Sequence, residues 1–203
     1  MGVAGAETDE ENPINKQRAS LGGWAGPLGF LWLVILLAAW QAGSAQEACI
    51  KRVFNRYCLG GDINAQLVQQ PLPLFQQPDG ELLAAVYQEG RERVYVMGFR
   101  GRIYKVVRQY QSATQLKFDD LYKTLRDKYG SGEDRSRFPG YARSPASKLG
   151  AIRRGDGRAV HFWDLAEQGF HVELNWNREM GLTLSYYASA LAEQVSQVLE
   201  QGL

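Results

Sequence analysis

The chain contains only two histidines, His161 and His171, and both fall where apolar and polar residues alternate. Alternation of this kind predicts β-strands, in which successive side chains point to opposite faces of a sheet. If the apolar residues Phe162 and Phe170 face each other on neighbouring strands, both histidines lie on the polar face, directly opposite one another. The first candidate for chemistry is therefore a pair of imidazoles held by two strands.

Glu173 follows on the same predicted face as the two histidines. Directly opposed strand residues have Cβ atoms about 5 Å apart, so two imidazoles and a carboxylate could share a zinc ion. His161, His171 and Glu173 would then serve a metal-assisted hydrolase, which is one alternative function. We expect instead no metal and no cofactor, because antiparallel sheets commonly leave one ordinary polar face in water.

The same polar face also brings together amide and aromatic side chains. The binding candidates on it are His161, Trp163, His171, Glu173, Asn175 and Tyr187. Exposed Trp and Tyr side chains are typical anchors of protein interfaces, and aromatic groups beside amides and carboxylates also suit glycans. The leading hypothesis is a non-catalytic binding domain whose partner is an envelope protein or a glycan.

Motifs that would indicate an enzyme are missing from the sequence. It contains no glycine-rich phosphate loop, no Gly-x-Ser-x-Gly elbow and no His-Glu-x-x-His helix. The acidic pairs Asp119-Asp120 and Glu133-Asp134 are explained by a helix start and by a loop. We therefore name no catalytic residue and expect no enzymatic activity.

Secondary structure must position these side chains, and strands outnumber helices in the pattern. Strands are expected at residues 82–87, 94–99, 103–110, 149–153, 158–164, 170–176 and 182–187, and helices at 118–129 and 189–201. No long helical crossover alternates with the strands. The fold class is α+β, an antiparallel sheet of meandering strands in two similar halves, with the helices packed on one side. A long loop, residues 131–147, separates the halves.

The region before this sheet contains both cysteines, Cys49 and Cys58. Helical spacing of apolar residues predicts a helix over residues 48–57, a second short helix over 63–68, and a proline-rich loop over 71–80. A nine-residue helix rises about 13.5 Å, whereas bridged Cα atoms lie within about 7 Å. Either the chain folds back here or the cysteines act separately, and we favour a disulfide between them.

An uncharged apolar stretch, residues 28–40, decides the expected compartment. Basic residues precede it and small residues follow at 42–45, which is the layout of a secretory signal. We expect residues 1–45 to be a signal peptide with a disordered leader, cleaved after Ala45. The alternative is an uncleaved membrane anchor, because no charge occurs between Arg18 and Glu47.

Both readings place residues 46–203 outside the cytoplasm as a single α+β domain. The expected location is periplasmic or extracellular, or membrane-anchored with the domain outside the cytoplasm. In the anchored case the protein would be a single-pass structural subunit with the inner membrane as a partner. If the signal peptide is cleaved, the inner membrane is not a partner, and we expect only an envelope protein or a glycan.

The charge balance excludes one class of partner. Without the first 45 residues, 21 basic and 18 acidic residues remain, a net charge of about +3. Nucleic-acid-binding domains are usually strongly basic, so we expect no nucleic acid. Arginines cluster near one turn, at Arg153, Arg154 and Arg158. They could meet phosphate or carboxylate groups of an envelope polymer, or could simply keep the turn soluble.

Overall fold

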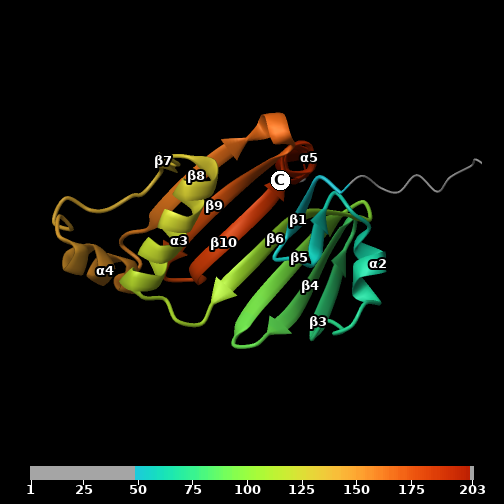
Figure 1. The fold of residues 1–203 in the computed structure, drawn as a ribbon, viewed down its shortest axis with the longest axis horizontal. Coiled ribbons are helices and arrows are strands. Elements are labelled where there is room, and N and C mark those ends of the chain that lie inside the picture. The colour runs from blue at the N-terminus through green and yellow to red at the C-terminus, as the bar shows by residue number, and fades with distance from the viewer. Residues whose placement is uncertain (1–48, 202–203) are drawn as a thin grey trace, which may run out of the picture. The chain divides into compact units, whose positions relative to one another are not determined.

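The computed structural model describes residues 49–201 of the chain. Its main feature is an eight-stranded antiparallel sheet (Figure 1). The strands are β3 (Phe75–Asp79), β4 (Leu82–Glu89), β5 (Glu92–Phe99), β6 (Arg102–Tyr110), β7 (Glu133–Asp134), β8 (Ala159–Leu165), β9 (Phe170–Asn177) and β10 (Gly181–Ala188). The order across the sheet is β3-β4-β5-β6-β10-β9-β8-β7.

Every neighbouring pair of strands in this sheet is antiparallel, and most are joined by a short turn. The four helices of the described region add to the sheet, which confirms the α+β class. The two central strands, β6 and β10, are the last strands before α3 (Gln115–Tyr129) and α5 (Ser189–Gln201). They bring the first and second parts of the chain into one continuous layer.

One face of the sheet, called the covered face below, carries most of the core. Helix α3 begins at its Thr114 cap, ends at Gly130, and lies across β8 and β9 (Figure 1). The hairpin of β1 (Lys51–Val53) and β2 (Tyr57–Leu59) and the helix α2 (Ile63–Leu67) cover the β4–β6 side. Buried aromatic and aliphatic residues from both parts of the chain join here into one hydrophobic cluster. The opposite face of the sheet is called the open face below.

Helix α5 lies on the open face, which corrects the expectation that all helices pack on one side. Five of its residues, among them Ala192 and Val195, line a hollow together with open-face side chains of β6, β8, β9 and β10. Val195 is its one fully buried residue. The helix boundaries, 189–201, agree with the prediction, but the hydrophobic stripe could not show which face of the sheet it would meet.

Helix α4 (Pro145–Arg154) occupies residues that were predicted to be a strand at 149–153 and the end of a loop at 131–147. Ser144 and Ser147 form a reciprocal capping box, and Pro145 occupies the first turn. Gly155 ends the helix in the left-handed conformation, with φ 86°. These start and stop signals outweigh the strand-like run Leu149–Arg153. The same predicted loop also contains the short strand β7.

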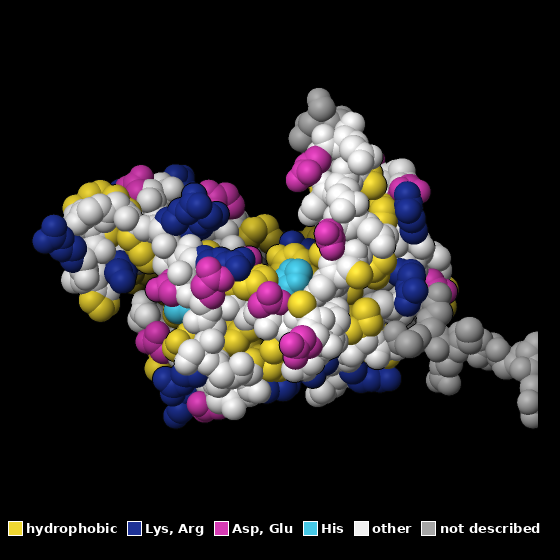
Figure 2. Space-filling view, turned by 90° about the horizontal axis from the view of Figure 1, so that it is seen from above, with side chains coloured by type: hydrophobic (Ala, Val, Ile, Leu, Met, Phe, Trp, Pro, Cys, Tyr) yellow, Lys and Arg dark blue, Asp and Glu magenta, His cyan; other side chains and the backbone are white. Residues whose placement is uncertain are grey.

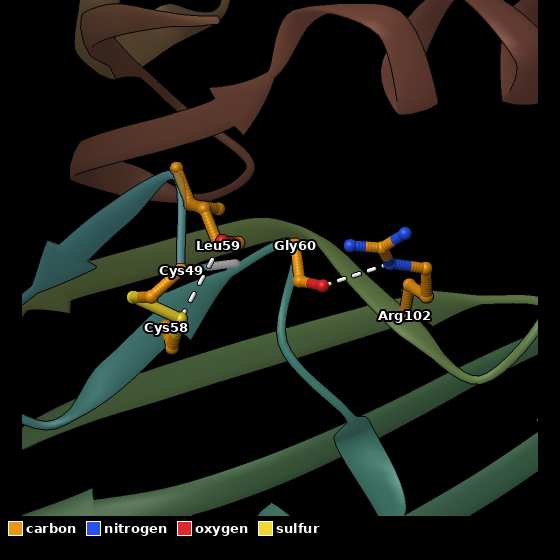
Figure 3. Close-up of a disulfide and its surroundings, with 5 residues drawn as sticks. All are labelled: Cys49, Cys58, Leu59, Gly60 and Arg102. Atoms are coloured by element: carbon orange, nitrogen blue, oxygen red, sulfur yellow. Dashed lines mark hydrogen bonds between the residues drawn. A yellow bond between two sulfur atoms is a disulfide. The ribbon is translucent and has the colours of Figure 1, made fainter. Parts of the chain in front are cut away.

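The β1–β2 hairpin replaces the helix predicted over residues 48–57. Phe54 and Asn55 turn the chain with positive φ values of 50° and 61°. The fold-back brings the Cα atoms of Cys49 and Cys58 to 5.4 Å, and the two residues form a disulfide (Figure 3). The predicted bridge is therefore confirmed, and the predicted helix is wrong because a helix would keep the two cysteines apart.

A side-chain hydrogen bond ties the chain after the hairpin to the sheet. Arg102 Nε donates to the carbonyl of Gly60 at 2.8 Å (Figure 3). Arg102 belongs to β6, so the chain just after Cys58 is fixed directly to the central sheet. The disulfide thus closes the hairpin, while the arginine bond attaches it.

Strand β3 is the other departure from the expected loops. Residues 71–80 were predicted as a loop because of their three prolines, yet Phe75–Asp79 pair with β4 as an exposed edge strand. Proline is tolerated on edge strands, where fewer ladder bonds are needed.

The predicted signal peptide or anchor, residues 1–45, lies outside the described residues. Within residues 49–201, no helix combines the length and the apolar character needed to cross a bilayer.

Candidate binding cleft

The pairing of β8 with β9 decides which side chains share a face, and it differs from the prediction. Leu165, rather than Phe162, lies opposite Phe170, and Phe162 lies opposite Glu173. The connection between the strands is therefore short, a 3₁₀ turn over Ala166–Gln168 that ends at Gly169. A shift of three residues is odd, so it moves every side chain of β8 to the other face of the sheet.

His161 and Trp163 consequently lie on the covered face, under α3. The indole nitrogen of Trp163 donates to the carbonyl of Gly130 at 2.8 Å, and the residue is only 3% exposed. The ring centroid of His161 lies 4.3 Å from that of Tyr122 and 5.9 Å from that of Phe118. Both residues are packing partners of the helix, so the prediction that they belong to an exposed binding face is wrong.

The proposed zinc ligands are separated by the sheet itself. His161 points to the covered face, whereas His171 and Glu173 point to the open face. Within the part of the chain that the structure describes, no group of three His, Cys, Asp or Glu side chains could hold a metal ion. The structure therefore does not bring the three proposed metal ligands together.

The other four binding candidates do share the open face. His171 lies opposite Tyr187, Glu173 opposite Ser185 and Asn175 opposite Thr183. The Asn175 side-chain amide donates to Glu173 Oε1 at 3.1 Å. Apolar and polar residues alternate without ambiguity in both strands, which favours this register.

His171 and Tyr187 belong to a row of stacked side chains that crosses five segments of the sheet. Their rings are nearly parallel, with centroids 4.5 Å apart and planes at 18°. The ring of Phe162 lies 5.1 Å from that of His171. Cations close both ends of the row: Arg135 lies 3.7 Å from the Phe162 ring, and Lys105 Nζ lies 4.6 Å from the Tyr187 ring. Stacking and cation–π contacts therefore fix the row in place.

Helix α5 stands beside this row and makes one wall of a cleft of about 420 Å³. Figure 2 looks into the hollow, where histidine, basic and apolar side chains lie at the foot of the projecting C-terminal helix. The floor is formed by Tyr104, Lys105, Phe162, Asp164, His171 and Tyr187, and the helical wall by Ser189, Ala192, Glu193, Val195 and Ser196. Glu173 and Asn175 continue the face beside the cleft.

Partial burial tunes the charges in this cleft. Burial lowers the pKa of His171, although the carboxylates of Asp164 and Glu173 act in the opposite direction. Burial also lowers the pKa of Lys105 and raises the pKa of Tyr187. At neutral pH the imidazole is therefore neutral, with one nitrogen donor and one nitrogen acceptor available for hydrogen bonding.

The arrangement presents ring edges rather than ring faces to a partner. The faces of Phe162, His171 and Tyr187 are occupied by one another and by the terminal cations. What remains accessible is a mixture of polar edges, both signs of charge and the apolar wall of α5.

Sequence reasoning missed several residues of the cleft, namely Lys105, Phe162, Asp164 and the α5 wall. Lys105 lies opposite Tyr187 only because β6 pairs with β10, a non-local pairing that no motif marks. Phe162 and Asp164 could have been found, because hairpin loops usually have two to five residues. A four-residue turn at 166–169 would have placed both on the open face.

Comparison with known proteins yields no family for this chain. No protein-family model and no curated protein matches it. Among solved structures, a cysteine-rich secretory protein from Staphylococcus aureus aligns over 72% of this chain and 48% of its own length, with 10% identity and a TM-score of 0.38.

An extracellular protein with an SCP domain from Bacillus anthracis aligns over 72% of this chain and 49% of its own, with 15% identity and a TM-score of 0.35. The chain therefore spans about half the length of the proteins it resembles. Similarity at this level supports no conclusion about ligand or activity.

Proposed function

We propose that this protein is an exported, non-catalytic binding domain that holds a segment of an envelope protein in the cleft between α5 and the open face. The observation that carries the proposal is the cleft itself, about 420 Å³ in volume, with a floor fixed by stacking and a wall made by one helix. A preorganised floor lowers the entropic cost of binding.

Protein is favoured over glycan because of what the cleft offers. Carboxylates at Asp164 and Glu193 and the amine of Lys105 lie around apolar Ala192 and Val195. Such a mixture suits a peptide, whose side chains and backbone provide apolar, charged and hydrogen-bonding groups together. Free aromatic faces, which a sugar would need, are occupied.

Export is supported by the Cys49–Cys58 disulfide together with the apolar stretch at residues 28–40. Disulfides persist in oxidising compartments and are rare in the cytosol. A periplasmic or extracellular location follows if the stretch is a cleaved signal. A membrane-anchored subunit, with the same domain outside the cytoplasm, follows if it is retained. The mass of the mature protein separates these two cases.

The test uses a photo-crosslinking amino acid at Ala192, on the cleft wall, in the full-length protein in its native envelope. Gln194 is the matched control, because it is an exposed residue of the same helix that does not line the cleft. We expect one defined protein adduct from position 192 and none from position 194.

A blocking variant makes the test sharper. Ala192→Trp should fill the cleft and remove adducts formed from a crosslinker at Ser196, whereas Gln194→Trp should leave them intact. Equal adducts from positions 192 and 194, or adducts at Ser196 that survive Ala192→Trp, would show that the cleft does not hold the partner. Circular dichroism confirms that both tryptophan variants are folded.

A further inference from the structure

A second surface, at the outer edge of the sheet, concentrates positive charge. Residues 135–158 contain seven basic side chains and one acidic side chain, although the whole chain has a net charge of only +1. The segment runs from the end of β7 through α4 to the start of β8. Figure 2 shows dark-blue groups at the end of the molecule that holds α4.

Two of these arginines face each other without a counter-charge. Arg137 and Arg158 are paired across an antiparallel bridge, with reciprocal N–H···O bonds of 2.9 and 2.8 Å between their backbones. Like charges directly opposite on a sheet are destabilising. Over residues 49–201, neither side chain forms an ion pair or a hydrogen bond.

Arg135 extends the pair into a row that we call the arginine edge, made of Arg135, Arg137 and Arg158. The Arg135 N–H donates to the carbonyl of Val160 at 2.9 Å, which continues the register that pairs Arg137 with Arg158 and puts both arginines on the open face. The stacking of Arg135 on Phe162 confirms this face. Its guanidinium is partly neutralised by Glu133, at 2.6 Å.

Beside the pair lies a polar hollow of about 310 Å³, whose lining includes Arg137, Arg158, Asn177, Asp156 and Glu179. The carboxylate of Asp156 already accepts hydrogen bonds from Tyr141 and from Arg154, at 2.8 and 3.0 Å. That carboxylate is therefore already engaged by Tyr141 and Arg154. Glu179, on the turn between β9 and β10, is the second carboxylate of the lining.

We propose that the arginine edge binds a linear polymer that carries repeated phosphate or carboxylate groups. A guanidinium matches either group through two parallel hydrogen bonds, and an anion between Arg137 and Arg158 would remove their repulsion. A single small anion at exposed arginines is screened by salt and bound weakly. Repeated anions along the row bind together, so a polymer gains affinity that one group lacks.

The length of the row limits the kind of polymer. Away from this edge the open face carries the carboxylates of Asp164, Glu173 and Glu193, which would repel a long polyanion. An anionic glycopolymer can place a few charged groups on the edge and leave the rest free. Arg137 and Arg158 do not line the cleft beside α5, so they can bind an anion whether or not the cleft binds a protein.

The test measures binding of the full-length protein to immobilised poly(glycerol phosphate) and polygalacturonate, with neutral dextran as the blank. Arg137→Gln combined with Arg158→Gln should weaken binding by about tenfold or more and reduce its salt dependence. The control, Arg91→Gln combined with Arg93→Gln, removes the same charge from two exposed arginines at the β4–β5 turn and should change affinity by less than about twofold.

Two further measurements distinguish recognition from general attraction. Without polymer, the edge variant should melt no lower than the unmodified protein, because it loses a repulsion. Replacing both arginines by lysine should restore only part of the affinity, since lysine keeps the charge but loses the two-pronged contact.

The polymer arms identify the source of the anion: binding to either polymer supports the proposal and names phosphate or carboxylate as the preferred group. Equal losses in the edge and control variants would overturn it, since charge alone would then explain binding. Binding to phosphatidylglycerol vesicles but to neither polymer would overturn it in favour of a membrane surface. An absence of binding to both polymers would also reject it. Ala192→Trp should leave polymer binding unchanged, so this result and that of the cleft can be told apart.

Discussion

The two faces of the same sheet use the same kinds of residue for opposite purposes. On the covered face, His161 and Trp163 are enclosed by the aromatic residues of α3, and Trp163 has its one polar group satisfied. On the open face, Phe162 packs against Arg135 and His171 stacks on Tyr187, at the margin of the cleft beside α5. Residue type alone therefore does not distinguish a structural histidine from one that could bind a partner.

The two faces also differ in whether their polar groups are paired within the protein or exposed to a binding partner. On the covered face, Arg108 pairs with Glu89, which also accepts a hydrogen bond from the Tyr57 hydroxyl at 2.8 Å, and the ring of Phe54 lies 4.0 Å from the guanidinium. This network fastens the β1–β2 hairpin to the sheet. The open face leaves the edges of its stacked row and the arginine edge exposed, which is where binding can add contacts.

The sharpest way to break this comparison is to truncate adjacent residues on the two faces. Trp163→Ala should lower the free energy of unfolding by about 3–5 kcal/mol, because it empties a buried site and removes the bond to Gly130. Phe162→Ala should lower the free energy of unfolding by only about 1 kcal/mol, since the Phe162 ring is partly exposed and water can fill the space that it leaves. Urea unfolding of the two variants, with the unmodified protein as reference, measures both costs.

Equal costs for Trp163→Ala and Phe162→Ala would mean that the open face is as well packed as the covered one, and that the cleft is not a solvent-filled space. The two substituted residues are adjacent in β8 and both are aromatic, so the two sites are closely matched in strand propensity and position.

The β8 register shows how much of the site could be predicted from the sequence. Val160, Phe162 and Trp163 are all apolar, so alternation does not decide which face of β8 is covered. Val160 and Phe162 together favour one face, but the structure covers the face that carries His161 and Trp163. What decides the matter is Tyr122 of α3, 41 residues before Trp163 in the chain, and only the fold brings the two together. The β9–β10 half of the site was predictable because neither strand has this ambiguity.

The second test concerns the hairpin that covers the sheet. Replacing Cys49 and Cys58 by serine together should cost about 2–3 kcal/mol, because the unfolded chain regains the freedom of a short closed loop. The effect should be local: amide exchange should accelerate in β1 and β2, while crosslinking from Ala192 in the cleft stays unchanged. Reducing agent should destabilise the unmodified protein by a similar amount and leave the double variant unaffected.

If cysteine replacement loosened the cleft as much as the hairpin, the two faces would not be independent. That outcome would point to coupling through Tyr186, whose ring lies 5.6 Å from Phe54 on the covered face and which directly precedes Tyr187 in β10.

The region of the disulfide shows two sequence signals in conflict, and the sequence alone does not decide between them. Helical spacing of apolar residues and the distance required by the bridge were incompatible for residues 48–57, and the structure obeys the bridge. The turn depends on Phe54 and Asn55 at positive φ, which is ordinary for asparagine but unusual for phenylalanine. Packing of Phe54 on Arg108 and Tyr186 compensates for that conformation, and no local pattern predicts it.

The smallest expected effect concerns pH and distinguishes the two histidines. Burial lowers the pKa of both His161 and His171 in the folded protein, with partial opposition from Asp134 at the first and from Asp164 and Glu173 at the second. The unfolded chain therefore binds more protons as the pH falls through about 6.5, and stability should decrease over that range. His161→Phe and His171→Phe should each remove part of the decrease, measured as the urea midpoint between pH 5.5 and 8.

The two variants should respond differently to salt, which is how the measurement separates the faces. His171 faces Asp164, Glu173, Arg135 and Lys105 across a cleft open to ions, so 0.5 M salt, with a Debye length of about 4 Å, should change its share of the decrease. The contribution of His161 should change less, because its Nδ1 atom is buried and its ring is packed against Phe118, Tyr122 and Trp163. If stability falls with pH just as much when both histidines are replaced, carboxylates elsewhere cause the loss. The pH dependence would then not report on the two faces.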